Sequence, residues 1–269
     1  MRRENPGSSR WRAGKITAGL LLTCGLFGAH GNANAGTDKP AILSRGEEFV
    51  PALSFEPNQG QAVEGVKFLA RSAGYTLFLT PLEVVITFEH SAVRAPSLRR
   101  PDSLVMTLVG GNSESHATAR HELPGRSSYL VGRNPQKWWT GIPTFEWVQF
   151  ANIYPGIDVS YRGPQGRLEY EFSVLPNSEP AQIAIEINGG NALYVRGGRL
   201  VVRTPDRELQ FDQATAYQET ASGRQYVSAK YRLLNPHRVG FVLGTYDRTK
   251  PLFIGPVLRY VESASSRRN

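Results

Sequence analysis

Apolar and polar residues alternate along most of this chain, from Phe49 to Tyr260. In Glu83–Glu89, for example, Val84, Ile86 and Phe88 fall on one face of an extended segment. Short segments of this kind recur with glycine, proline and asparagine between them, a pattern typical of β-strands joined by turns. The predicted strands are 66–70, 75–80, 83–89, 104–109, 127–131, 145–150, 157–162, 168–175, 183–187, 193–196, 200–203, 218–221, 225–234, 239–243 and 252–257.

Two connections are specified by their residue types. Gly197-Gly198 separates two predicted strands, and both glycines accept the positive φ angles of a two-residue hairpin turn. Asn134-Pro135-Gln136-Lys137 predicts one helical turn, with Asn134 as its cap and Pro135 in its first position. The sequence therefore predicts an all-β fold with very little helix. We expect an antiparallel β-sandwich, built either as one unit or as two lobes with a seam near residues 110–120.

The first 35 residues follow a different pattern. A basic start that ends at Lys15 is followed by an uncharged apolar run over residues 16–29 and by Ala33-Asn34-Ala35. This order is that of a secretory signal peptide, cleaved near Ala35. We therefore expect the protein to be exported, and to be secreted, periplasmic or at the cell surface.

The expected organisation follows from these two patterns. Residues 1–35 are the signal peptide, 36–48 a flexible leader, 49–260 the β-sandwich domain and 261–269 a disordered tail. The apolar run is too short to span a bilayer comfortably, and no second run reaches that length, so no transmembrane segment is expected.

Charge and cysteine content narrow the possible partners. The chain has a net charge of +8, half of which lies in residues 1–35, and the remaining basic residues are scattered. This distribution does not predict a nucleic-acid partner. The only cysteine is Cys24, inside the predicted signal peptide, so the exported chain is expected to contain no disulfide.

Several segments, taken in order, carry a resemblance to a known family. They include Phe55-Glu56-Pro57-Asn58-Gln59-Gly60-Gln61, Tyr154-Pro155-Gly156-Ile157-Asp158 and Leu168-Glu169-Tyr170-Glu171-Phe172. Over residues 50–258 the chain resembles the uncharacterised N-terminal domain that precedes SBBP repeats, a predicted β-propeller repeat, in secreted bacterial proteins. The resemblance implies an exported all-β module with no known reaction.

The chain departs from that family near its end. In the family an acidic residue usually precedes the proline that Pro256 matches, whereas this chain has Gly255. The sequence also ends in a serine-rich stretch shortly after Tyr260, so we expect the repeats themselves to be absent. A separate propeller-containing chain is therefore one expected partner.

Trp138, Trp139 and Trp147 are the candidate ligand-binding residues. They lie in the segment with the most aromatic residues after the signal peptide. Flat aromatic rings stack on sugars and anchor peptides at interfaces. The alternative is that they fill one end of the sandwich. Adjacent residues of a strand face opposite sides, so Trp138 and Trp139 cannot both be buried if they lie in a strand.

Glu169 and Glu171 are the alternative, catalytic candidates. They lie two residues apart on a predicted strand, so their carboxylates share a face at about 6.5–7 Å, near the separation that glycosidases use. The simpler interpretation is that both point to water, because the apolar residues Leu168, Tyr170 and Phe172 alternate with them.

Other acidic residues are interpreted as structural. Glu56 is expected to pair with an arginine, while Asn58 bonds its own backbone in a turn. Asp158 and Asp247 are expected to cap loops. No metal-ligand spacing is present among the histidines and acids, so no metal and no other cofactor is predicted.

Three functions remain open from the sequence. The first is an exported, non-catalytic binding or assembly module for a protein or glycan outside the cytoplasm. The alternative is a carbohydrate-active enzyme that uses surface carboxylates. The third is a folding or export prodomain for a separate propeller.

Overall fold

The computed structural model describes residues 51–72, 74–88, 103–205, 207–255 and 258–261. The described chain is all-β, and the strand pairs are antiparallel, as the alternating pattern predicts. The predicted signal peptide, leader and tail lie outside the described residues, apart from Val261 at the end of the last strand. No helix of the described ranges is long and apolar enough to cross a membrane.

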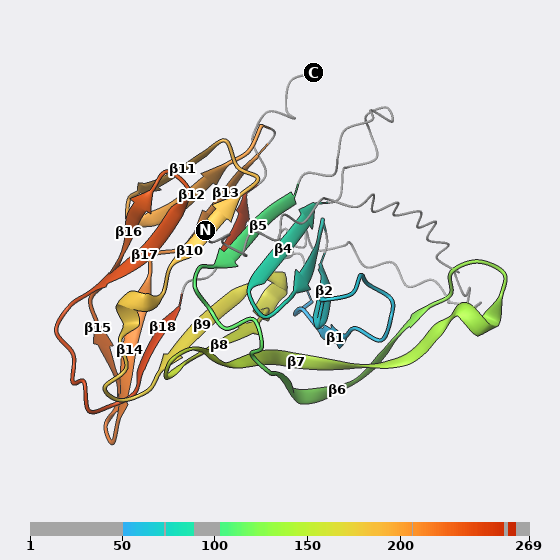
Figure 1. Cartoon of the computed structure of the whole chain (residues 1–269), viewed down its shortest axis with the longest axis horizontal. Coiled ribbons are helices and arrows are strands. Elements are labelled where there is room, and N and C mark those ends of the chain that lie inside the picture. The colour runs from blue at the N-terminus through green and yellow to red at the C-terminus, as the bar shows by residue number, and fades with distance from the viewer. Residues whose placement is uncertain (1–50, 73, 89–102, 206, 256–257, 262–269) are drawn as a thin grey trace, which may run out of the picture.

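A large sheet forms most of the molecule, and it folds over on itself (Figure 1). Along one half the strand order is β1 (Phe55–Pro57), β2 (Phe68–Ser72), β3 (Tyr75–Leu79), β4 (Glu83–Phe88), β5 (Ser103–Leu108), β10 (Ile185–Asn188), β17 (Arg238–Leu243) and β16 (Ala229–Asn235). Along the other half it is β7 (Trp139–Tyr154), β8 (Ile157–Arg162), β9 (Glu169–Val174), β18 (Leu252–Gly255), β14 (Thr215–Thr220) and β15 (Gly223–Val227).

The long strand β7 joins the two halves. Phe145 pairs with β1, whereas the stretch from Trp147 to Tyr154 pairs with β8. The opposite side of β7 pairs with β6 (Ala117–Tyr129), which has no other partner strand among the described residues. The two halves face each other, and in Figure 1 β4 and β5 lie above β7, β8 and β9.

A smaller sheet lies beside the large one. It contains β11 (Ala192–Arg196), β12 (Arg199–Arg203), β13 (Glu208–Phe211) and β19 (Leu258–Val261). The predicted hairpin turn is confirmed, because Gly197 and Gly198 adopt φ angles of 57° and 78° between β11 and β12.

One buried cluster fills the space between these layers. Phe172 of β9 meets Phe241 of β17 edge-on, with ring centroids 6.3 Å apart, which links the two halves of the large sheet. Phe211 of the small sheet meets Tyr170 in the same way. Residues from both sides of 110–120 belong to this cluster. Large apolar side chains removed from water in this way supply the main stabilisation of the fold.

Short helical turns connect several strands. They are the 3₁₀ turns η1 (Pro135–Lys137), η2 (Pro164–Gly166) and η3 (Pro180–Gln182). The predicted turn after β6 is confirmed as η1, where Asn134 accepts a hydrogen bond from the backbone N–H of Gln136 at 3.0 Å.

Some predicted strand boundaries are wrong. The single strand predicted over 225–234 is two strands, β15 and β16, which separate at Ser228 because they pair with opposite ends of the large sheet. The turn before β15 is Ala221-Ser222, since Thr220 pairs with Gly223. β6 begins at Ala117, ten residues before the predicted strand 127–131. β1, β13 and β19 have no counterpart among the predicted strands.

Candidate ligand-binding pocket

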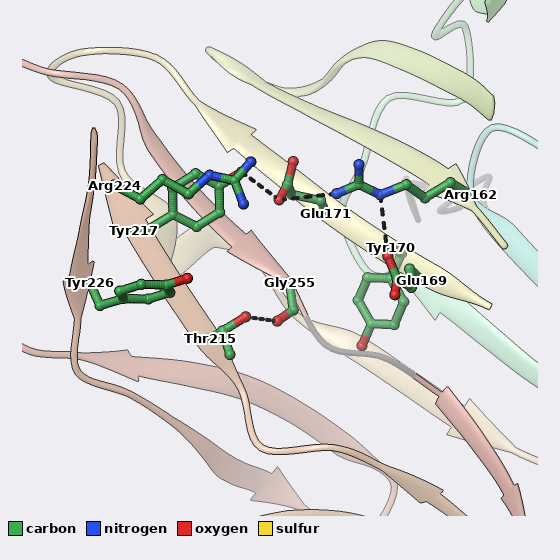
Figure 2. A pocket seen from close by; sticks show the side chains of 9 residues that line it. All are labelled: Arg162, Glu169, Tyr170, Glu171, Thr215, Tyr217, Arg224, Tyr226 and Gly255. Atoms are coloured by element: carbon green, nitrogen blue, oxygen red, sulfur yellow. Dashed lines mark hydrogen bonds and ion pairs between the residues drawn. The ribbon is translucent and has the colours of Figure 1, made fainter. Parts of the chain in front are cut away.

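An open pocket of about 190 Å³ lies on the outer face of the large sheet (Figure 2). Its floor crosses five strands, because β9, β18, β14 and β15 pair side by side and β8 adjoins β9. Phe172 of β9 and Ala216 of β14 face inward and belong to the core, whereas Glu171 and Tyr217 alternate with them and line the pocket. Tyr170 belongs to the core and also borders the pocket. The lining residues are Arg162, Glu169, Tyr170, Glu171, Thr215, Tyr217, Arg224, Tyr226 and Gly255.

Glu169 and Glu171 are both in this pocket, on the same side of β9. Arg162 of β8 lies opposite Glu169 in the strand register and holds both carboxylates. Its Nε is 3.3 Å from one oxygen of Glu169, and its Nη2 is 3.8 Å from one oxygen of Glu171. The two side chains are 25% and 20% exposed, so the carboxylates are accessible from the pocket.

Tyr217 of β14 forms the central wall of the pocket. Its hydroxyl donates a hydrogen bond of 2.9 Å to Glu171. Burial, with the neighbouring charge of Glu171, raises the pKa of Tyr217 to about 12. The phenol therefore stays protonated near neutral pH and remains a donor to the carboxylate.

Both faces of the Tyr217 ring are covered. Phe253 of β18 stacks on it at a centroid distance of 5.0 Å and an interplanar angle of 17°. The guanidinium of Arg224 lies over the ring, 4.2 Å from its centroid. This cation–π contact fixes Arg224 at the pocket edge while its remaining N–H groups stay available to a ligand.

Tyr226 is the free aromatic surface of the pocket. It lies opposite Tyr217 in the β14–β15 register, with ring centroids 6.3 Å apart, and 72% of the residue is exposed. A tyrosine combines an apolar ring with a polar hydroxyl, and this combination is why tyrosine is enriched at interfaces.

Gly255, at the edge of the pocket, lets β18 lie close to the backbone of β9. A Cβ atom at this position would lie 2.9 Å from the carbonyl oxygen of Tyr170, closer than real Cβ atoms approach backbone. Thr215 donates a hydrogen bond of 2.7 Å to the Gly255 carbonyl, which fixes β18 against β14 at this point.

The three tryptophan candidates do not lie in this pocket. Trp138 and Trp139 are at the closed end of the β6–β7 hairpin, and Trp147 lies eight residues further along β7, roughly 26 Å away at the usual rise of a strand. All three are half-buried. Trp138 donates to the carbonyl of Gly132 at 3.1 Å, and Trp147 meets the ring of His121 edge-on at 6.0 Å. The three residues therefore do not form one continuous surface.

The contacts of Glu56 differ from the predicted pair with an arginine. It is only 5% exposed, and its carboxylate accepts hydrogen bonds from Ser127, at 2.8 Å, and from Tyr129. Arg71 lies nearby, but its Nε donates to the Tyr129 hydroxyl at 3.2 Å rather than to the carboxylate. Among the described residues no arginine pairs directly with Glu56, because strand β6, whose pairing the sequence does not specify, supplies Ser127 and Tyr129 as donors.

Asn58, Asp158 and Asp247 serve loops, as predicted. Asn58 organises its own loop by accepting bonds from the backbone N–H groups of Gly60 and Ala62, both at 3.0 Å. Asp158 accepts from the backbone N–H of Asn152 at 2.7 Å, and Asp247 from that of Thr249 at 2.9 Å. Across the described residues, no group of three or more His, Cys, Asp or Glu side chains could hold a metal ion.

Sequence reasoning missed Arg162, Tyr217, Arg224 and Tyr226. The only available signal was the spacing of two residues between Arg224 and Tyr226, which places them on one face if both lie in a strand, but the predicted strand began at 225. That they face Glu171 depends on the pairing of β9 with β18 and of β18 with β14.

Comparison with known protein families gives a match over most of the described chain. A family model described as a domain of unknown function (DUF7948) matches residues 55–257. Neither the curated proteins nor the solved structures contain a significant match to the chain.

Proposed function

Since this chain belongs to the family of the domain of unknown function DUF7948, we propose its function from its own structure: it is an exported, non-catalytic module that binds a neutral glycan in the Tyr226 pocket. The single observation that carries this proposal is the exposed Tyr226 ring beside a set of fixed hydrogen-bonding groups. Sugars present an apolar C–H face to an aromatic ring and hydroxyl groups to polar side chains.

The charges in the pocket support a neutral ligand. Arg162 and Arg224 balance Glu169 and Glu171, so the pocket has no excess charge to attract an ion. Carboxylates accept and guanidinium groups donate hydrogen bonds, a combination that suits hydroxyl groups, which do both. At about 190 Å³ the pocket is smaller than those that enclose drug-sized ligands, so it suits one ring of a longer chain.

The surroundings of the carboxylates support binding rather than hydrolysis. The general acid of a glycosidase is usually held in apolar surroundings that keep it protonated. Glu169 and Glu171 instead share the guanidinium of Arg162, and Glu171 also accepts from Tyr217. This arrangement makes them fixed acceptors.

The proposed compartment rests on the N-terminal segment. Its basic start, apolar run and Ala33-Asn34-Ala35 support export. Extracellular or periplasmic glycans would then be the available ligands.

A glycan array followed by calorimetric titration tests the proposal. The chain is purified in the form that the producing cells release, and wild type is compared with Tyr226→Ala and Tyr226→Phe. Tyr226→Ala should weaken binding by about tenfold or more, as loss of an interface tyrosine commonly does, whereas Tyr226→Phe keeps the ring and should bind within about threefold of wild type.

Two further variants separate this pocket from the tryptophan candidates. Trp138→Ala and Trp139→Ala should leave glycan binding unchanged, because neither residue lines the pocket. If they abolish binding and Tyr226→Ala does not, the site is the hairpin and the pocket proposal is wrong.

The presence of both glutamates in one pocket favours a second candidate, a carbohydrate-active enzyme. It predicts release of reducing sugar from the bound glycan. Release that is lost in Glu169→Gln or Glu171→Gln, with binding retained, would replace the binding proposal by this one.

A further inference from the structure

The closed end of the β6–β7 hairpin is a second distinctive surface, separate from the pocket. We call residues 130–138 the hairpin tip. Figure 1 shows the hairpin extending from the body of the molecule, with its tip at the far end. None of residues 128–138 is buried. The tip is therefore a convex projection rather than a groove.

The base of the tip is fastened to the body on both sides. On the β6 side, Ser127 and Tyr129 donate to the buried carboxylate of Glu56. On the β7 side, the indole of Trp139 packs over Gly60, where a Cβ atom would lie 3.0 Å from the indole nitrogen. These contacts hold the hairpin in a fixed direction.

The tip itself is ordered by internal bonds. The indole of Trp138 donates to the Gly132 carbonyl at 3.1 Å, and the backbone N–H of Lys137 donates to the Asn134 carbonyl at 3.0 Å. A surface that is already ordered loses less conformational entropy when it binds.

The side chains of the tip combine apolar exposure with positive charge. Leu130 and Val131 are 60% and 44% exposed, and Trp138 is half-exposed. Arg133 and Lys137 are exposed beside them. The sequence has no Asp or Glu from residue 123 to 145, so no acidic side chain within the tip offsets these cations.

We propose that the hairpin tip binds an anionic phospholipid surface, with Leu130 and Val131 entering the interface. Aliphatic side chains gain from insertion below the headgroups, tryptophan is favoured at the boundary, and lysine and arginine are attracted by anionic lipids. The charge of the tip is complementary to such a surface.

Size argues against a stable protein interface at the same place. Protein partners usually contribute about 20–30 residues each to a specific contact. A convex tip of nine residues is too small for that, but it is large enough to enter a lipid surface, which needs no matching groove. The proposal does not depend on glycan binding, since the tip and the pocket share no residue.

Vesicle flotation tests the proposal. The released chain is mixed with vesicles of phosphatidylcholine alone or with phosphatidylglycerol added, at about 0.1 M and 1 M salt. The wild type should float with the anionic vesicles only, and high salt should reduce the bound fraction because it shortens the range of charge attraction from about 10 Å to 3 Å.

Variants of the tip assign the binding to its residues. Arg133→Gln with Lys137→Gln should lower partitioning at least tenfold, since each cation near an anionic surface contributes about fivefold. Leu130→Ser with Val131→Ser should also lower it at least tenfold.

Strand β16 offers matched controls. Lys230→Gln with Arg232→Gln removes the same charge, and Leu233→Ser with Leu234→Ser removes similarly exposed aliphatic side chains. Both control pairs should bind like wild type, and all comparisons keep the same N-terminus.

The opposite results would overturn the proposal. These are no flotation of the wild type, equal flotation with neutral vesicles, or equal losses in the tip and control variants. Retention on an acidic peptide without binding to vesicles would assign the tip to a protein partner instead.

Discussion

The hydroxyl of Tyr217 donates to the carboxylate of Glu171 at 2.9 Å, across 46 residues of sequence. This bond joins β14 to β9 over the intervening strand β18. It also positions the acceptor that Arg162 holds from the other side. The relationship is therefore both a tertiary cross-link and the centre of the candidate pocket.

Removing this hydroxyl should destabilise the protein modestly. Tyr217→Phe keeps the stack between Phe253 and Arg224 but leaves Glu171 without one donor, so we expect the free energy of unfolding to fall by about 1 kcal/mol. Urea denaturation measures this change. Tyr226→Phe is the matched control and should change stability by less than about 0.5 kcal/mol, because its hydroxyl is on the exposed surface. Equal stability of the two variants would contradict the role of the Tyr217–Glu171 bond.

A side chain at position 255 should harm both stability and the pocket. In Gly255→Ala the new methyl group meets the carbonyl of Tyr170 at 2.9 Å, and the backbone of β9 or β18 has to shift. Such overpacking costs about 1–3 kcal/mol. Thermal unfolding checks the cost. The control is Gly125→Ala, where the nearest atom is 3.6 Å away, and its melting temperature should stay close to that of wild type.

The buried carboxylate of Glu56 should be needed to hold the hairpin. Glu56→Ala leaves the hydroxyl groups of Ser127 and Tyr129 without their acceptor, so we expect a loss of about 2 kcal/mol in the free energy of unfolding. The substitution should also increase the rate of backbone hydrogen exchange in β6 more than in β9. Glu64→Ala changes an exposed glutamate of the neighbouring loop and should have neither effect. Unchanged exchange in β6 would show that Glu56 does not fasten the hairpin.

Alkaline pH should destabilise the fold through its tyrosines. Burial raises the pKa of Tyr75, whose hydroxyl bonds the carbonyl of Gly166, to about 12, and it raises the pKa of Tyr129 to about 12, with the bond to Glu56 as a further cause. Burial also raises the pKa values of Tyr161, Tyr170 and Tyr231.

Stability falls as the pH rises because the tyrosines ionise at a lower pH in the unfolded chain than in the folded chain. The unfolded chain loses these protons near pH 10, before the folded chain does, so stability is fully present below pH 10 and falls between about pH 10 and 12. Urea midpoints at pH 8, 10 and 11 measure the fall. The Tyr75→Phe variant has no ionisable group at this position, so its urea midpoint should fall less with pH than that of the wild type. An identical pH dependence in wild type and variant would exclude Tyr75 as a contributor.

Local sequence accounts well for the strands that alternate clearly. Val84, Ile86 and Phe88 are buried as their spacing predicts, and Gly197-Gly198 forms the expected turn. β13 was missed although Glu208–Phe211 alternates, because its strand conformation depends on pairing with β12 and on packing of Leu209 and Phe211 into the core. The β15–β16 boundary was missed because both segments alternate alike and separate only where their partners differ.

The sequence alone determined which side chains face the core and which face water, because the period of two in a strand specifies a face. It placed Glu169 and Glu171 on one outer surface in this way. Only the tertiary structure decided that Arg162, Tyr217, Arg224 and Tyr226 lie beside them. Strand pairing over long sequence separations depends on how the whole core packs, and alternation within one strand carries no information about which other strand lies next to it.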